Sequence, residues 1–548
     1  MRILAVVLLS IAVATSQTNP ESAWPQPGRS VVYGVHGMAA TSQPLATAAA
    51  LKILQQGGSA ADAAIAAAAV LNVVEPHMTG IGGDMFALYY RADSRDLYGL
   101  NGSGHSPAAA SIEKYRALQG SAADASGILA VTVPGAVDGW ISLHERFGKK
   151  PWKELLQPAI EYAENGFPVT PIIAEQWASQ VEKLKRNDAA AANYLVDGEA
   201  PRAGEIFFQK DLGKTLKLLA EGGREAFYRG AIAKKIVAES RRLGGLLTEE
   251  DFALHRSEWV QPVSTRFGTR TVFQMPPNSQ GIATLEMLNI AAGFDLKKMR
   301  HNSADYLHTL IESKKIAFAD RDHYLSDRNA VPKNVLELIS PAYAARRRKE
   351  VNPKRAAVSY APALPEQGDT VYLCVVDQER NAVSFINSLF SLFGSGIVVP
   401  ETGICLHSRG NSFQLREGVS NSLGPRKSPM HTLIPGMVFE DQFPVLVYGV
   451  MGADMQPQGH VQVLLNLFTF GMDLQQAGEA PRARHSQAGV ALEAGIPAAI
   501  GRALEMRGHK LVKQHDVWGG YQAISIDWRK GTLAGASDPR KDGCALGW

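Results

Sequence analysis

The chain has 548 residues and a formal net charge of +3, because 56 Lys and Arg face 53 Asp and Glu. At roughly 150 residues per domain, this length allows three to four domains, or fewer if one large core absorbs them. The 45% hydrophobic and 20% charged fractions are ordinary for a soluble globular protein. A nucleic-acid-binding domain concentrates basic residues on one face, whereas the basic run from Arg346 to Lys349 is isolated, so we expect no nucleic-acid partner.

The three cysteines, Cys374, Cys405 and Cys544, have no CxxC or Cys/His spacing. This pattern excludes a disulfide scaffold and a structural zinc site of the usual kind. A Walker loop has no match either, and we predict neither a metal nor a cofactor.

The N-terminus has the pattern of a secretory signal peptide over residues 1–16. Arg2 precedes an apolar run over residues 3–14, and small residues then offer cleavage after Ala14 or Ser16. The run is shorter than the ~20 residues that a membrane span needs. We therefore expect a secreted or periplasmic protein without a stable membrane anchor.

Two helices and a glycine-rich turn are predicted next. Residues 39–56 have helical spacing and stop at two glycines, and Ser59 then stands at the N-cap of an alanine-rich helix over residues 60–74. A glycine cluster over residues 79–84 leads into a predicted strand at 85–90. A dinucleotide-binding turn needs the opposite order, strand before helix, so this turn is a weak nucleotide-loop candidate.

From Pro151 to about Ile339 the pattern is mostly amphipathic helix, for example over residues 152–165 and 304–322. Residues 351–369 lose periodicity and are predicted to form an extended surface loop. Strands are then predicted at 370–377 and 382–388, with a further strand at 444–448, a helix at 461–470 and a final strand at 522–527. This order favours a sheet with helices packed against it.

Candidate nucleophiles follow by elimination. No Gly-x-Ser-x-Gly motif occurs, and Cys374 and Cys405 lie in apolar strands, where a thiol is usually inert. Thr370 lies between a loop and a buried strand, where a newly freed α-amine could act as base for its hydroxyl. On these grounds alone the signal is weak, because most threonines that open a strand simply favour strand structure.

Several motifs occur in one order: "TGIGGDMF" from Thr79, "VPGAVDGW" from Val133, "GDTVYLCVVD" ending at Asp377, "FGSGIVVPETGI" from Phe393, and then "APRARH" and "GASDPR". Through them the chain resembles the γ-glutamyltransferase family of N-terminal-nucleophile (Ntn) hydrolases along nearly all of its mature length. The resemblance implies an α+β fold, a four-layer αββα sandwich. It also implies a proenzyme that cuts itself between Asp369 and Thr370. The products are a helix-rich large chain, 17–369, and a sheet-rich catalytic chain, 370–548, which form a heterodimer.

In this resemblance Thr370 is the nucleophile and, after cleavage, also the base. The family stabilises the oxyanion with two adjacent backbone N–H groups on a glycine turn, and the matching residues here are Gly452 and Ala453. An alanine is tolerated at such a turn if its φ is negative.

The positions that bind a γ-glutamyl group depart from the family. Ser103 stands where the family has an arginine for the α-carboxylate, with His105 nearby. The residues that match the family's ligands of the α-ammonium and its paired serines are Phe390, Arg409, Ser412, His431 and Thr432. Arg409 would repel an ammonium group. The lid from Phe413 to Gly424 is shorter than in glutathione-processing members.

We therefore expect a self-processing hydrolase of a small carboxylated amide, whose acyl anion meets Arg409 and His431. The chain resembles the γ-glutamyltransferase-like branch that includes oxamate amidohydrolase. A purely structural salt bridge is an equal interpretation of Arg409. One alternative is a γ-glutamyl hydrolase or transferase that acts on glutathione and related compounds. Another is a non-enzymatic binding scaffold.

Overall fold

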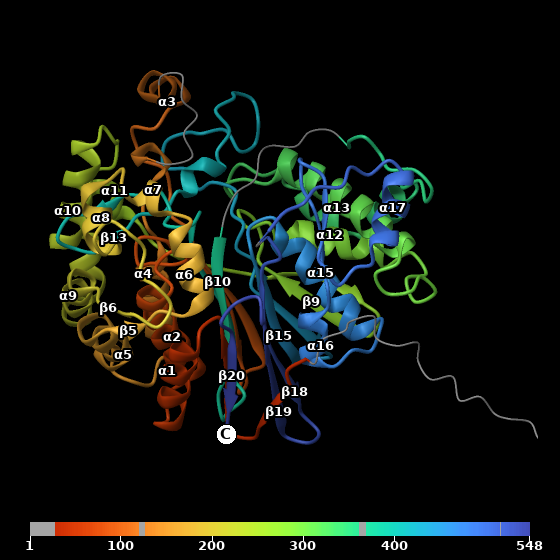
Figure 1. Ribbon diagram of the computed structural model, residues 1–548, viewed down its shortest axis with the longest axis horizontal. Helices are drawn as coiled ribbons and strands as arrows, with labels where there is room; N and C mark the ends of the chain where they lie inside the picture. The colour runs from red at the N-terminus through yellow and green to blue at the C-terminus, as the bar shows by residue number, and fades with distance from the viewer. Residues whose placement is uncertain (1–27, 120–126, 361–368, 516) are drawn as a thin grey trace, which may run out of the picture.

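The computed structural model describes residues 28–119, 127–360, 369–515 and 517–548. The predicted signal peptide, residues 1–16, lies outside them. Two antiparallel sheets face each other between two layers of helices, as the resemblance implied, and Figure 1 shows the four layers edge on. No helix among the described residues has both the length and the apolar character that a membrane crossing requires.

The first sheet has the strand order β20 (Cys544–Gly547), β2 (Met38–Thr41), β10 (Asp369–Val376), β11 (Ala382–Phe390), β3 (Asp84–Arg91), β4 (Asp96–Gly102) and β7 (Glu258–Val260). The second has the order β1 (Val32–Gly34), β19 (Thr532–Ser537), β18 (Gly520–Asp527), β15 (Phe443–Met451), β14 (Gly436–Glu440), β9 (Arg270–Gln274) and β8 (Val263–Phe267). Each sheet therefore combines strands from both sides of residue 370.

The predicted strands 370–377 and 382–388 form the β10–β11 hairpin in the middle of the first sheet. Residues Val371–Val376 are all buried, because helices cover one face of the strand and the second sheet covers the other. A strand buried on both faces has no polar alternation, which explains its continuous apolar sequence.

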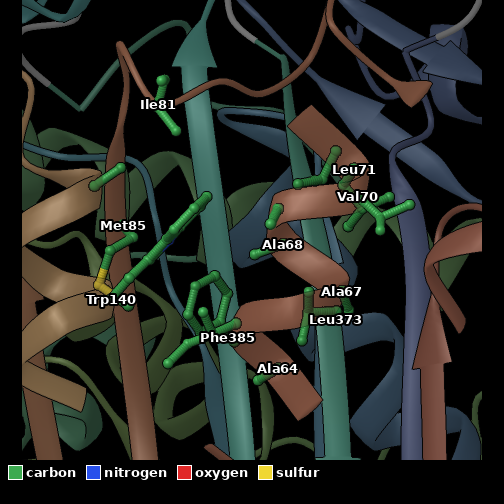
Figure 2. Packing of buried hydrophobic residues seen from close by; sticks show 14 of the residues in the cluster. Ala64, Ala67, Ala68, Val70, Leu71, Ile81, Met85, Trp140, Leu373 and Phe385 are labelled. Carbon is green, nitrogen blue, oxygen red and sulfur yellow. The ribbon is translucent and has the colours of Figure 1, made fainter. Parts of the chain in front are cut away.

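Helix α2 (Ala60–Val74) packs on β10 and β11 and is buried all round. Figure 2 shows Ala64, Ala67 and Ala68 of this helix near Leu373 and Phe385 of the sheet. A methyl side chain lets the helix axis lie close to the strands, so small residues suit this position. The predicted N-cap is confirmed, since the Asp62 N–H donates to the Ser59 hydroxyl at 3.1 Å and the Ser59 N–H donates to the Asp62 carboxylate at 2.9 Å.

The helix predicted over residues 39–56 is partly wrong. Its first residues belong to β2, and α1 (Pro44–Gln55) begins only at Pro44. The alanines and Met38 of β2 are fully buried between layers, so their apolar run follows from burial and not from a helical face.

The other helical layer covers the second sheet and contains α12 (Gly281–Ala291), α13 (Ala304–Tyr324), α15 (Met455–Phe468) and α16 (Leu474–Glu479). Helix α15 begins well before the predicted residue 461. Its first turns contain Pro457 and Gly459, which are unfavourable inside a helix but tolerated near its start.

Further elements complete the layers. They are α3 (Ile112–Gln119), α4 (Ala136–Phe147), α5 (Trp152–Asn165), β5 (Phe167–Pro168), α6 (Pro171–Ala178), α7 (Val181–Leu184), α8 (Asp188–Tyr194), β6 (Ile206–Phe207), α9 (Lys210–Tyr228), α10 (Ala231–Arg242), α11 (Glu249–Leu254), α14 (Pro341–Arg348), β12 (Val398–Val399), β13 (Ile404–Cys405), β16 (Ala483–His485), β17 (Val490–Leu492) and α17 (Ala498–Met506). The prediction of α5 is confirmed at both ends. Strands β7 to β9 interrupt the stretch predicted to be mostly helical, and β19 and β20 follow the strand predicted to be the last.

Glu75 is the C-cap residue of α2, and its ionisation makes the stability of the fold depend on pH. Its side chain is buried and accepts a hydrogen bond from the Ser42 hydroxyl. Burial raises the pKa of Glu75 from 4.5 to about 7, although the bond from Ser42 opposes the shift. The folded state therefore holds this proton to a higher pH than the unfolded chain does.

The stabilising effect of this proton is complete below about pH 4.5 and is lost as the pH rises to about 7. We predict that Glu75→Gln is more stable than the wild type at pH 8, by on the order of 3 kcal/mol, and close to it at pH 4.5. Urea unfolding across this range measures the difference. The exposed Glu113→Gln is the control, and parallel pH curves for wild type and Glu75→Gln would contradict the assignment.

Candidate active site

Thr370 lies at an irregularity of the central hairpin. Asp369 pairs with Phe390 and Val371 pairs with Asn387, so two residues of β11 face Thr370 alone. Such a β-bulge bends the strand and changes the direction of a side chain. The Thr370 side chain is buried, and its hydroxyl donates a hydrogen bond to Ser388 Oγ at 3.1 Å.

Ser388 was not predicted as a site residue, yet its hydroxyl joins several parts of the site. Besides the Thr370 hydroxyl, it accepts the N–H of Phe390 at 2.8 Å and Nη2 of Arg409 at 3.5 Å. Its only signal in the sequence is its place at the end of a predicted strand. These bonds fix the position of the Thr370 oxygen relative to β11.

The predicted oxyanion turn, Gly452 and Ala453, lies between β15 and α15. Their φ values are +113° and +47°, so the condition of a negative φ at Ala453 is not met. The left-handed region costs a non-glycine residue about 1–2 kcal/mol, and such strain often occurs at functional sites. Among the described residues, neither of the two N–H groups donates a hydrogen bond to another residue.

A cavity of about 310 Å³ lies beside this turn. Four predicted site residues line it: Phe390, Ser412, Thr432 and Ala453. Because Phe390 pairs with Asp369, the start of β10 borders the same cavity. The structure thus brings the oxyanion turn and part of the predicted substrate pocket to one cavity, and Ser388 connects the buried Thr370 hydroxyl to Phe390 in its wall.

Arg409 does not line this cavity. It is fully buried, and its guanidinium lies 4.4 Å from the centre of the Phe390 ring. Nη1 donates to Thr432 Oγ1 at 2.9 Å, and Nε is 3.9 Å from Asp84 Oδ2. Burial lowers the pKa of Arg409 to about 9, against the effect of Asp84, so the side chain remains cationic at neutral pH.

Asp84 is the anion of this buried cluster. Its Oδ1 accepts the N–H groups of Gly104 and Gly135, each at 3.1 Å, and its Oδ2 accepts Nε2 of His431 at 3.1 Å. Desolvation favours the neutral acid, but His407 and His431 outweigh it and hold the pKa of Asp84 well below its usual range. The carboxylate is therefore ionised.

His431 belongs to this cluster and not to the cavity wall. It is fully buried and its ring centre is 4.6 Å from that of Phe86. Burial, together with the charge of Arg409, lowers the pKa of His431 to about 3, so the neutral imidazole donates to Asp84. Its role in the structure is to support the wall behind the cavity.

Ser103 and His105 lie apart from the cavity. The Ser103 hydroxyl accepts Asn278 Nδ2 at 3.0 Å in a buried amide network, and His105 is partly buried with Nδ1 3.1 Å from the Ser106 carbonyl oxygen. Between them, Gly104 donates to Asp84. This segment therefore supports the buried cluster.

Four charged residues that the sequence analysis did not predict also line the cavity: Arg321, Asp322, Asp454 and Arg416. Arg321 and Asp322 lie in the predicted helix 304–322, where the sequence pattern gives no sign that they line a cavity. The Arg321 guanidinium is 2.5 Å from Asp454 Oδ1 and 2.7 Å from Asp322 Oδ1.

One group of described residues has the composition of a metal site. Its members are His308, Glu312 and His509, whose possible ligand atoms lie within 4.8 Å of one another. The carboxylate of Glu312 already accepts Lys315 Nζ, the Ala357 N–H and the Tyr360 hydroxyl, at 2.7, 3.1 and 3.1 Å. Nδ1 of His308 is hydrogen-bonded to His509, and Nε2 of His308 is hydrogen-bonded to the Asn352 carbonyl oxygen. This network attaches residues 352–360 to α13.

Comparisons with known proteins agree with the overall fold and identify a family. The family model described as Gamma-glutamyltranspeptidase matches residues 46–548. The chain is 38% identical over 526 residues to the glutathione hydrolase-like YwrD proenzyme of Bacillus subtilis, covering 94% of this chain and 99% of that one. It is 35% identical over 532 residues to the oxamate amidohydrolase proenzyme of Klebsiella pneumoniae, covering 94% and 98%. The crystal structure of cephalosporin acylase from Bacillus halodurans matches with a TM-score of 0.90 and 41% identity, over 96% of this chain and 99% of that one.

The contacts of Asp84 predict that the substitution Asp84→Asn strongly destabilises the folded state. Asp84→Asn removes the charge that accompanies buried Arg409, and breaking a buried ion pair costs about 3–5 kcal/mol. We expect unfolding in urea at a clearly lower concentration. The exposed pair Arg91–Asp93 supplies the control, and Asp93→Asn should unfold at nearly the same urea concentration as the wild type, because solvent screens an exposed pair. Equal effects of the two substitutions would show that Asp84 does not carry the cluster.

Proposed function

This chain belongs to the gamma-glutamyltranspeptidase family, and on that premise we propose that it is a self-processing amide hydrolase whose nucleophile is Thr370. Its relatives are hydrolases, and those from Bacillus subtilis and Klebsiella pneumoniae are named proenzymes. The observation that carries the proposal is the place of the Thr370 hydroxyl, which bonds to Ser388 beside a cavity whose wall includes Ala453.

The first step of the proposal is maturation. The Thr370 oxygen attacks the carbonyl carbon of Asp369, and its proton passes to the amide nitrogen as the C–N bond breaks. An ester replaces the peptide bond. Water then hydrolyses the ester, which leaves a carboxylate on Asp369 and a free α-amine on Thr370. The bulge supports this step, because it removes Thr370 from the regular ladder.

Turnover uses the same hydroxyl. The free α-amine of Thr370 takes the hydroxyl proton while the oxygen attacks the substrate's amide carbonyl. The N–H groups of Gly452 and Ala453 stabilise the oxyanion, and the proton goes to the departing amine. Water then cleaves the acyl ester and releases an acid. The two N–H groups without partners among the described residues support this role.

The cut chains remain together in this proposal as a heterodimer of residues 17–369 and 370–548. Strand β10 pairs with β2, and β14 pairs with β9, so the ladders cross between the two parts in both sheets. Separation would expose the centre of both sheets. We also infer export from the signal-like residues 1–16, which lie outside the described part of the chain.

We propose a small amide with a carboxylate on its acyl group as substrate. A cavity of about 310 Å³ suits a small acyl chain. The name of the Klebsiella relative includes oxamate, a small amide that carries a carboxylate, and the Bacillus halodurans neighbour is a cephalosporin acylase. Arg409 stands where the family binds an ammonium group, which disfavours a γ-glutamyl substrate held in the family's manner.

The maturation step predicts two outcomes on a denaturing gel and by intact mass. The wild type should give two chains, the smaller beginning at Thr370, whereas Thr370→Ala should stay whole because it has no attacking oxygen. Thr532→Ala, at the start of β19, is the matched control and should be cut. A folded wild type that stays whole would favour the binding-scaffold alternative.

Initial rates separate the two enzymatic alternatives. The mature protein should turn over oxamate with saturation and give much lower rates with γ-glutamyl-p-nitroanilide, because Phe390, Arg409 and Ser412 stand where the family binds the α-ammonium group. Thr370→Ala measures the rate of hydrolysis that does not depend on the Thr370 hydroxyl. Strong, saturable γ-glutamyl turnover would instead support the glutathione-type alternative, with its ligands supplied by other residues.

A further inference from the structure

We propose that Arg416 is the receptor for the carboxylate on the substrate's acyl group. This inference rests on the proposed function and deepens it, because it assigns the anion site to a residue that the sequence did not indicate. Arg416 lies in the lid segment between Phe413 and Gly424 and lines the same cavity as Ala453.

Two arginines line the cavity, and the positive charge of one of them, Arg321, is already balanced by carboxylates. Arg321 is only 4% exposed, lies between the carboxylates of Asp322 and Asp454, and has its guanidinium 3.9 Å from the centre of the Phe318 ring. A substrate carboxylate would have to displace one of these two fixed anions. Arg321 is therefore better suited to stabilise the cavity wall than to bind a second anion.

Arg416 has the opposite surroundings. It is exposed, and the one hydrogen bond of its guanidinium to the described residues is long, 3.5 Å from Nη2 to Gln414 Oε1. No carboxylate of the described chain lies within 4.0 Å of its guanidinium nitrogens. Gln414 in turn donates to the Asp322 carbonyl at 3.4 Å, which links the lid to the end of α13. The guanidinium is free to meet an incoming anion.

Arg409, the residue that the sequence favoured, is a poor receptor by comparison. Phe390 and Thr432 line the cavity and contact its guanidinium, and it also bonds to Ser388. A carboxylate could reach it only after these contacts break. Its charge is matched by Asp84 and not by a ligand.

The arrangement defines the chemical class of the acyl group. The oxyanion turn at Ala453 and the cation at Arg416 line one small cavity, so the acyl group is a short chain with its amide carbonyl at one end and a carboxylate at the other. A guanidinium binds a carboxylate through two parallel hydrogen bonds. Solvent access limits the gain, and we expect on the order of tenfold in kcat/KM.

The test compares two anilides with mature protein. Glutaryl-p-nitroanilide carries the carboxylate, and valeryl-p-nitroanilide has a methyl group in its place. Arg416→Gln should lower the glutaryl-to-valeryl ratio of kcat/KM about tenfold, chiefly through the KM of the glutaryl compound. Arg416→Lys should restore part of the ratio, since it returns the charge without the planar fork.

A neighbouring arginine supplies the matched control. Arg426 is exposed and pairs with Glu250 at 2.6 Å, outside the cavity, so Arg426→Gln should keep the wild-type ratio. A ratio that does not change in Arg416→Gln overturns the proposal. Equal losses on both anilides also overturn it, because they indicate a structural role of the lid.

Calorimetric titration with glutarate tests the anion site without catalysis. About tenfold weaker binding to Arg416→Gln than to the wild type supports the site, and equal binding overturns it. Failure of the proposed function would look different. It would appear as a wild type that stays uncut and hydrolyses neither anilide, whatever the glutarate result.

Discussion

The buried carboxylate of Asp84 holds the candidate site together. It receives backbone N–H groups from two loops, at Gly104 and Gly135, and a ring nitrogen from His431, and it lies beside the Arg409 cation. These groups come from segments far apart in the sequence. An ionised carboxylate in a dry interior is tolerated only with such partners, so the loops are held in one arrangement.

The cluster fixes the cavity wall indirectly. Arg409, which lies beside Asp84, donates hydrogen bonds to Thr432 and Ser388. Ser388 in turn accepts a hydrogen bond from the Thr370 hydroxyl. In the wall and behind it, Arg321 and Arg409 lie beside carboxylates, whereas Arg416 in the lid has no carboxylate partner among the described residues. A site built in this way keeps its nucleophile fixed while the exposed rim is left to select the substrate.

Much of this architecture was predictable from sequence. The β10–β11 hairpin, α2 with its cap and α5 are indicated by long apolar runs, by Ser59 and by regular helical spacing, all of them local signals. The sequence does not predict β8 and β9, because their polar, half-exposed residues give no clear apolar run. It predicts helix at β2, because the alanines there suit either structure.

The site divides in the same way. Thr370 lies in one of the ordered motifs and the turn at Gly452 follows from the family resemblance, but the burial of Arg409 behind Phe390 depends on how distant segments pack. The positive φ of Ala453 is likewise a property of the folded turn. No local pattern in the sequence could distinguish Arg409 from Arg416 as the exposed cation.

The interleaving of the two sheets has a consequence for refolding. The uncut chain brings β2 to β10 and β9 to β14 within one molecule, so its folding is a first-order process. After the proposed cut, the same ladders join two separate chains, and their assembly from the denatured state becomes a bimolecular reaction. The mature protein would then recover from denaturation only at a sufficient concentration of both chains, and its lifetime would depend on how slowly it unfolds.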